Sequence, residues 1–116
     1  MLFRSTFPDS DELDLTSTFT ISAFIKKAVN TGTGKEYIVD KQSEYSGKGY
    51  WFAIEGSGFE TSFDLEAGIY IGSDTFRIAK ATISMPLSTW THVSVSYSGT
   101  EIVLSMDGAE IGRAHV

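Results

Sequence analysis

Apolar and polar residues alternate most regularly between Trp90 and Gly112 (WTHVSVSYSGTEIVLSMDGAEIG). Successive side chains point to opposite faces of a β-strand, so a period of two residues predicts a half-buried strand. Val93 and Val95 would share one face of the first strand, with His92 on the other. Asp107-Gly108 is typical of a tight hairpin turn, because both central positions of a type I′ turn need positive φ. The stretch therefore predicts three antiparallel strands in series.

The same alternation predicts a series of strands before Trp90. They are Phe19 to Lys27, Tyr37 to Gln42, Tyr50 to Glu55, Phe59 to Leu65, Ile69 to Ile71 and Thr75 to Ala79, with Ala81 to Ser84 either continuing or following the last. Phe24 alone interrupts the polar face of the first strand. Tyr50 to Glu55 (YWFAIE) is apolar on both faces, which is typical of a central strand or of one that carries a partner surface.

These short strands, about eight or nine in number, favour an all-β fold. No segment of ten or more residues has the apolar spacing of three and four that a helix needs. An antiparallel β-sandwich or jelly roll is the expected architecture, with a small barrel as the alternative. The 116 residues correspond to a single domain spanning residues 1–116.

Strands that alternate in direction place their turns at two ends of a sandwich. One end would hold the turns at residues 30–35, 56–58, 72–74 and 98–100, and the other those at 43–48, 66–68, 84–89 and 107–108. Near the second end lie three aromatic residues with polar neighbours, which form the candidate ligand-binding patch: Tyr45, Tyr50 and Trp51. Alternatively Tyr50 and Trp51 are core residues, since large aromatic side chains are usually mostly buried.

Composition and charge restrict the classes of partner. The chain is 41% hydrophobic and 13% aromatic, which argues against disorder, and it has no cysteine for a disulfide or a thiolate metal site. Nine basic and fifteen acidic residues give a net charge of −6. That balance disfavours nucleic-acid binding and attachment to an anionic membrane. No run approaches the ~20 apolar residues of a membrane-spanning helix. We therefore expect neither nucleic-acid binding nor membrane insertion.

Three stretches resemble the laminin-G-like branch of the concanavalin A-like lectin and glucanase jelly rolls. They are LTSTFTISAFIK at Leu15 to Lys26, GYWFAIE at Gly49 to Glu55, and the stretch from Leu87 to Gly112. In that family an FTISAW-type strand, a GYW strand and a WTHVAVTYDG…LYVDG hairpin follow one another in this order. The family usually continues with further strands that close the sandwich. The resemblance therefore implies one of two arrangements: a sandwich that lacks its usual C-terminal strands and has an open edge, or one that the N-terminal residues close.

The resemblance also suggests where to look for catalysis. Glucanases of this architecture carry their acids on one strand as E-x-D-x-x-E, because alternation then puts the acid and the nucleophile on one face. Glu12-Leu13-Asp14 matches the first two acids, but Ser17 stands where the third would be. His92 has no acid at close spacing to orient it as a base. We therefore predict that the protein is not an enzyme.

Calcium is the cofactor that relatives of this fold often hold in a cluster of loops. Carboxylates that could contribute oxygen ligands are Asp9, Asp11, Asp14, Glu55 and Asp74. Their spacing matches no dedicated calcium loop, and acids near β-turns are commonly turn formers instead. No cofactor is expected, and a calcium ion at these acids remains the alternative.

The leading prediction is a non-catalytic recognition or assembly module that binds a glycan or a protein surface. An unpaired sheet edge invites strand addition, so we expect a homo-oligomer or docking on a larger assembly. The alternatives are a structural virion component, such as a phage capsid decoration or tail-fibre accessory protein, and a degenerate glucanase. The N-terminal residues contain no apolar stretch like that of a signal peptide. We predict an extracellular or virion-surface location.

Overall fold

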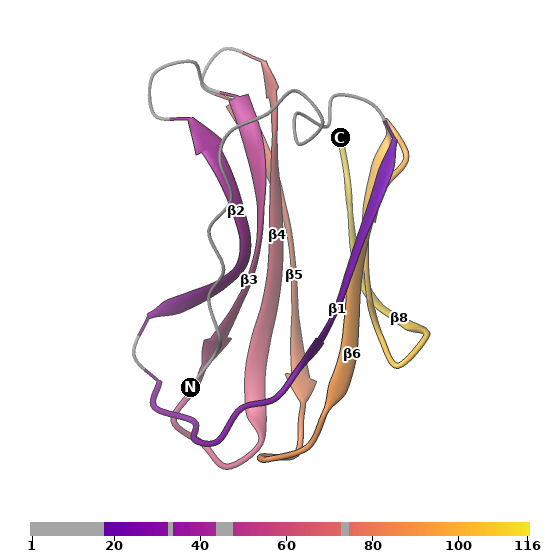
Figure 1. The fold of residues 1–116 in the computed structure, drawn as a ribbon. Helices are drawn as coiled ribbons and strands as arrows, with labels where there is room; N and C mark the ends of the chain where they lie inside the picture. Colours follow the sequence, from indigo (N-terminus) through magenta and orange to yellow (C-terminus); the bar gives the residue numbers. More distant parts are fainter. Residues whose placement is uncertain (1–17, 33, 44–47, 73–74) are drawn as a thin grey trace.

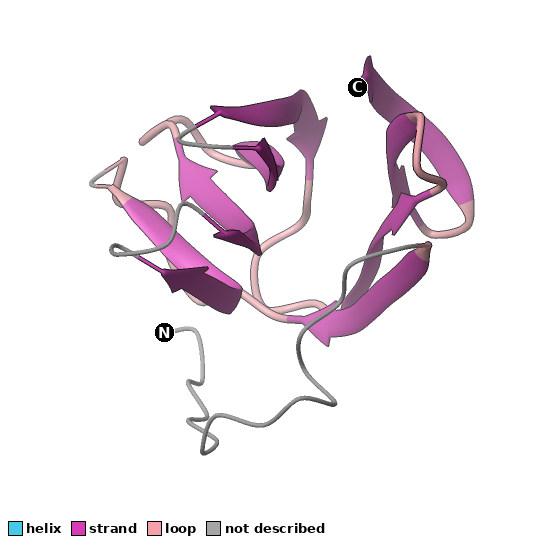
Figure 2. Cartoon of the chain, turned by 90° about the horizontal axis from the view of Figure 1, so that it is seen from above, coloured by secondary structure: helices cyan, strands magenta, loops and turns pink. Residues whose placement is uncertain are grey.

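The computed structural model describes residues 18–32, 34–43, 48–72 and 75–116. These residues form two four-stranded antiparallel sheets that face each other (Figures 1 and 2). One sheet has the order β1-β6-β7-β8 and the other β2-β3-β4-β5. The strands are β1 (Phe19–Ile25), β2 (Lys35–Ser43), β3 (Lys48–Gly56), β4 (Ser62–Gly72), β5 (Thr75–Ser84), β6 (Thr91–Tyr97), β7 (Glu101–Met106) and β8 (Ala109–His115). The predicted all-β sandwich is confirmed, and the described residues include no helix that could span a membrane.

The alternation that predicted β6 and β7 also explains how their sheet packs. Val93, Val95 and Leu104 are almost fully buried, and Val95 is the cross-strand partner of Leu104. His92 lies on the opposite face and is half-buried. The turn after β7 has φ of 51° at Asp107 and 84° at Gly108. Positive φ at both positions confirms the tight hairpin.

The strand with two apolar faces, β3, is central in its sheet, between β2 and β4. Phe52 and Ile54 point into the sandwich and belong to the hydrophobic core. Ala53 is also fully buried, although it alternates onto the outer face. The core unites both sheets, and its members are Ile25, Tyr50, Phe52, Ile54, Phe63, Leu65, Ala67, Ile69, Ala79, Ile83, Met85, Val93, Val95, Ile102 and Leu104.

One expected turn is wrong, and the distribution of the turns changes with it. Residues 66–68 lie in the middle of β4, where Gly68 pairs with Trp51 of β3. Because β4 is continuous, the connections after β1, β3, β5 and β7 share one end of the sandwich, at the bottom of Figure 1. The predicted grouping had separated the first two of these connections from the last two.

Two interactions fix that end of the molecule. The ammonium of Lys27, which follows β1, bonds to the Glu36 carboxylate in β2 and so links the two sheets. The Ser88 amide donates to the Lys27 carbonyl at 2.6 Å.

Among the described strands, β1 and β8 are the edges of one sheet, and β2 and β5 those of the other. Pairing of such an edge with another chain stays a prediction.

Candidate functional site

Of the three predicted ligand-binding aromatic residues, Tyr45 lies outside the described residues. Tyr50 is only 4% exposed and points into the sandwich, where its ring centroid lies 5.4 Å from that of Phe19. Tyr50 thus belongs to the core, as the alternative interpretation has it. The acids Asp9, Asp11, Asp14 and Asp74 also lie outside the described residues, as does Glu12.

Trp51 lies on the outer face of the β2-β3-β4-β5 sheet but is only 6% exposed. Its ring packs edge-on against Tyr70 at 6.1 Å and Phe76 at 5.5 Å between centroids. We call these three residues the outer aromatic cluster. The indole Nε1 has no hydrogen-bond partner among the described residues. Because Tyr70 and Phe76 pack against the Trp51 ring, Trp51 offers little surface to a ligand.

Charged side chains on the same outer face are mutually paired. Lys35 lies 3.0 Å from a Glu66 carboxylate oxygen, and Lys80 lies 3.6 Å from one of Asp64. The hydrogen bond that the Lys35 ammonium donates to Glu66 raises the pKa of Lys35 above its ordinary value of 10.5. Glu55, the one described member of the predicted metal set, is the cross-strand partner of Asp64. Nowhere in the described part of the chain do three potential metal ligands come together.

Two strongly exposed aromatic residues lie in β1 and just before β6, at one end of the other sheet. Phe24 and Trp90 are 68% and 65% exposed. The Phe24 ring meets the His92 ring edge-on at 4.9 Å, and the Lys26 ammonium lies 5.6 Å from the centroid of the Trp90 ring. We call Phe24, Lys26, Trp90 and His92 the aromatic end patch.

Strand pairing explains why these four side chains meet. Phe24 is the cross-strand partner of His92, and the register continues through Ile25 opposite Thr91. The next step of the same register sets Lys26 opposite Trp90. Residues two apart on a strand share a face, so both pairs point away from the core. Diagonal neighbours on antiparallel strands are about 7–8 Å apart, which lets one ligand contact both Phe24 and Trp90.

The backbone under the aromatic end patch is held on both sides. The His92 amide donates to the Asp107 carboxylate at 3.2 Å, and the Asp107 amide donates to the His92 carbonyl at 2.8 Å. On the β1 side, Lys27 is bonded to Glu36 and Ser88 as described above. The patch therefore has a preorganised support, which reduces the entropy lost on binding.

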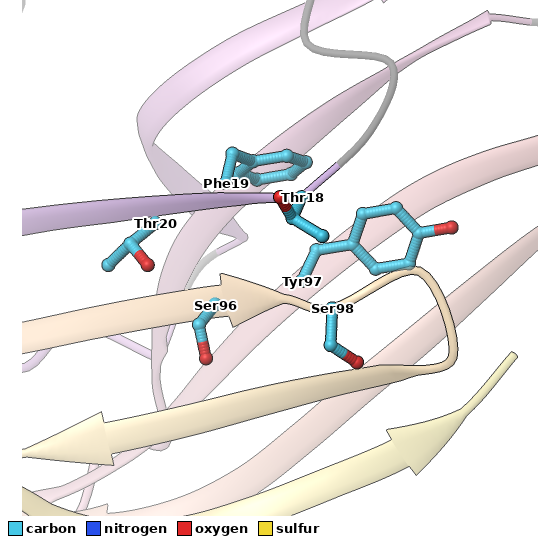
Figure 3. Close-up of a pocket in the computed structure, with 6 residues that line it drawn as sticks. All are labelled: Thr18, Phe19, Thr20, Ser96, Tyr97 and Ser98. Atoms are coloured by element: carbon cyan, nitrogen blue, oxygen red, sulfur yellow. The ribbon is translucent and has the colours of Figure 1, made fainter.

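A separate hollow of about 340 Å³ lies between the start of β1 and the end of β6 (Figure 3). The rings of Phe19 and Tyr97 border it together with the hydroxyls of Thr18, Thr20, Ser96 and Ser98. None of these residues carries a charge, and the Tyr97 hydroxyl donates to the Gly99 carbonyl at 3.4 Å. The hollow thus offers hydroxyls but lacks a charged group such as the Lys26 ammonium of the aromatic end patch.

Only part of the aromatic end patch could be predicted from the sequence. Phe24 stood out because it interrupted a polar strand face, and that interruption is now explained by its exposed position. Trp90 had no such signal, because it precedes its strand. Finding the pair needed the register between β1 and β6, which join residues about seventy positions apart.

The family comparison adds to this geometry. Residues 4–116 match the family model of the concanavalin A-like lectin/glucanases superfamily, of the laminin G type. The chain belongs to this superfamily. Searches of the curated proteins and of the solved structures found no match. Membership confirms the resemblance noted in the sequence and agrees with the jelly-roll sandwich. A superfamily of lectins and glucanases suggests carbohydrate or protein binding and includes both enzymes and non-enzymes.

Proposed function

We propose that this superfamily member is a non-catalytic carbohydrate-recognition module whose binding surface is the aromatic end patch. The observation that carries the proposal is the exposure of two rings, Phe24 and Trp90, which the register between β1 and β6 brings to the same outward side of the sheet. Large exposed apolar groups gathered at one place commonly mark a binding site.

The chemistry of the patch suits a sugar. One side of a pyranose ring presents C–H groups, which an aromatic face can cover and remove from water. Hydroxyls at the rim of the sugar need polar partners, and Lys26 and His92 lie next to the two rings. A few polar groups around an apolar platform fix the orientation of a ligand.

A binding role without catalysis is supported by the state of the outer-face acids. Glycoside hydrolysis needs two carboxylates that act on the same bond. Glu66 is held by Lys35, whereas Asp64 accepts from the Thr82 hydroxyl at 2.8 Å and lies near Lys80.

The alternative roles in assembly or in a virus particle stay predictions, as do calcium binding and an extracellular location.

A glycan array followed by calorimetry on the hits tests the proposal. We expect Trp90→Ala to weaken binding by about 30-fold or more, as for a Trp at the centre of an interface. Phe24→Ala should weaken it as well. Both side chains are exposed, so the free energy of unfolding should change by less than about 0.5 kcal/mol.

The matched control is Phe76→Leu, which alters an exposed ring on the other sheet. It should leave the affinity for glycans unchanged. A blank array, or full binding by Trp90→Ala, would overturn the proposal. Protein capture in place of glycan binding, lost on Trp90→Ala, would instead assign the patch to a protein partner.

A further inference from the structure

The aromatic end patch carries one lysine, Lys26. The net charge is −6, and four described cations are paired with carboxylates, in Lys27–Glu36, Lys35–Glu66, Lys80–Asp64 and Arg113–Glu101. Lys26 makes no ion pair with a described residue and instead places its ammonium 5.6 Å from the Trp90 ring centroid. A positive charge thus stands beside the proposed sugar platform.

The acid that contacts the patch, Asp107, is directed at the His92 backbone. Asp107 accepts a hydrogen bond from the His92 amide at 3.2 Å, and it belongs to the turn between β7 and β8. In the sheet order, β6 stands between β7 and β1, which leads into Lys26. The Asp107 carboxylate therefore lies on one side of β6 and the Lys26 ammonium on the other.

From this charge arrangement, we propose that the aromatic end patch selects carbohydrates that carry an anionic group, either a carboxylate or a sulfate. Lys26 pairs with that group while the Phe24 and Trp90 rings hold the sugar. This inference rests on the proposed function, because it concerns the ligand of the same site. The inference goes beyond the proposed function because it assigns a preference for charged ligands to a single residue, Lys26.

The expected size of the preference follows from the exposure of the patch. An ion pair in water contributes modestly, so an anionic sugar should bind about two- to fivefold more tightly than its neutral counterpart. Screening should reduce this preference as the salt concentration rises. The aromatic contribution is not an ion pair and should depend little on salt.

Matched ligand pairs test the inference by calorimetry on the whole chain. One pair is an oligogalacturonate and its methyl ester, which share a backbone and differ in the carboxylate charge. The second is a sulfated oligosaccharide and its desulfated form. We expect at least one anionic carbohydrate to bind two- to fivefold more tightly than its neutral counterpart. Comparing the two pairs shows whether the site prefers a carboxylate or a sulfate group. Lys26→Gln should equalise the members of that pair, and the control Lys80→Gln should preserve the difference.

The outcomes separate the two proposals. If the neutral members bind as tightly as the anionic ones, or if Lys26→Gln keeps the preference, the inference is overturned and the sugar platform stands. If no carbohydrate binds, or if binding survives Trp90→Ala, the proposed function itself is overturned. A preference that persists unchanged at high salt would also contradict the assignment to Lys26.

Discussion

The indole of Trp51 occupies the space that a side chain at residue 68 would need. Trp51 and Gly68 are cross-strand partners in β3 and β4. A Cβ atom on Gly68 would lie 2.0 Å from Cζ2 of the indole and 2.1 Å from Cη2. Glycine is therefore required here for a close approach within a sheet, although its place in the sequence resembled a turn.

Gly68→Ala should force the Trp51 ring out of its position. We expect a loss of about 1–3 kcal/mol in the free energy of unfolding, the usual cost of overpacking a well-packed region. Urea unfolding measures the loss. The tryptophan emission of Gly68→Ala in a Trp90→Phe background reports on the indole of Trp51 alone.

Gly108→Ala is the matched control for this substitution. Residue 108 has φ of 84°, but a Cβ there would meet no atom within 4 Å. Its cost of about 1 kcal/mol should come from the backbone alone and leave the Trp51 emission unchanged. Unaltered emission and stability in Gly68→Ala would contradict the close packing.

The extent to which the sequence predicted the fold depended on how local the signal was. The two-residue period from Val93 to Leu104 and the Asp107-Gly108 turn are local, and both are confirmed. Gly68 was misinterpreted as part of a turn. The reason for a glycine at this position is the ring of Trp51, which lies seventeen positions earlier in the sequence. Period alone cannot separate a glycine that forms a turn from one that admits a neighbouring side chain.

The candidate site was harder to predict for the same reason. Tyr50 and Trp51 are adjacent in sequence, yet alternation sends Tyr50 into the core and Trp51 to the outer face. Exposure of a ring depends on what covers it, and Trp51 is covered by Tyr70 and Phe76. Phe24 and Trp90 become one surface only through strand pairing. Such long-range contacts are not encoded in any short window of the sequence.

The ion pair between Lys27 and Glu36 should respond asymmetrically to mutation. The Lys27 side chain is 5% exposed, whereas that of Glu36 is 35% exposed. Glu36→Ala leaves a buried ammonium without its partner, and we expect a loss of about 3 kcal/mol in stability. Lys27→Met leaves a carboxylate that water can reach and should cost less than about 1.5 kcal/mol. Urea unfolding of both variants measures the difference, and equal losses would contradict the assigned burial.

Lys35 gives the stability a specific dependence on alkaline pH. Its hydrogen bond with Glu66 raises its pKa in the folded state above 10.5. The charged form therefore stabilises the fold at pH values below 10.5, and the contribution is lost as pH rises through the higher, folded-state pKa. Because the Lys35 side chain is 36% exposed, we expect no more than about 1 kcal/mol. The stability difference between wild type and Lys35→Gln should thus be present at pH 8 and shrink above pH 10.5. A difference that is constant to pH 11.5 would argue against the raised pKa.

Asp107 supports the aromatic end patch through its side-chain hydrogen bond and through its backbone conformation. Two substitutions distinguish these two contributions from that of its charge. The residue adopts a φ of 51°, and its carboxylate accepts from the His92 amide. Asp107→Asn keeps a side-chain oxygen and tolerates positive φ, so its stability should stay within about 0.5 kcal/mol of wild type. Asp107→Ala loses the acceptor and adopts this backbone conformation less readily, and we expect a cost of about 1–2 kcal/mol. Hydrogen exchange of the His92 amide should accelerate in the alanine variant alone. An equal loss of stability in the two variants relative to wild type would show that the charge of Asp107, and neither its hydrogen bond nor its backbone preference, supports the β7–β8 turn beside His92.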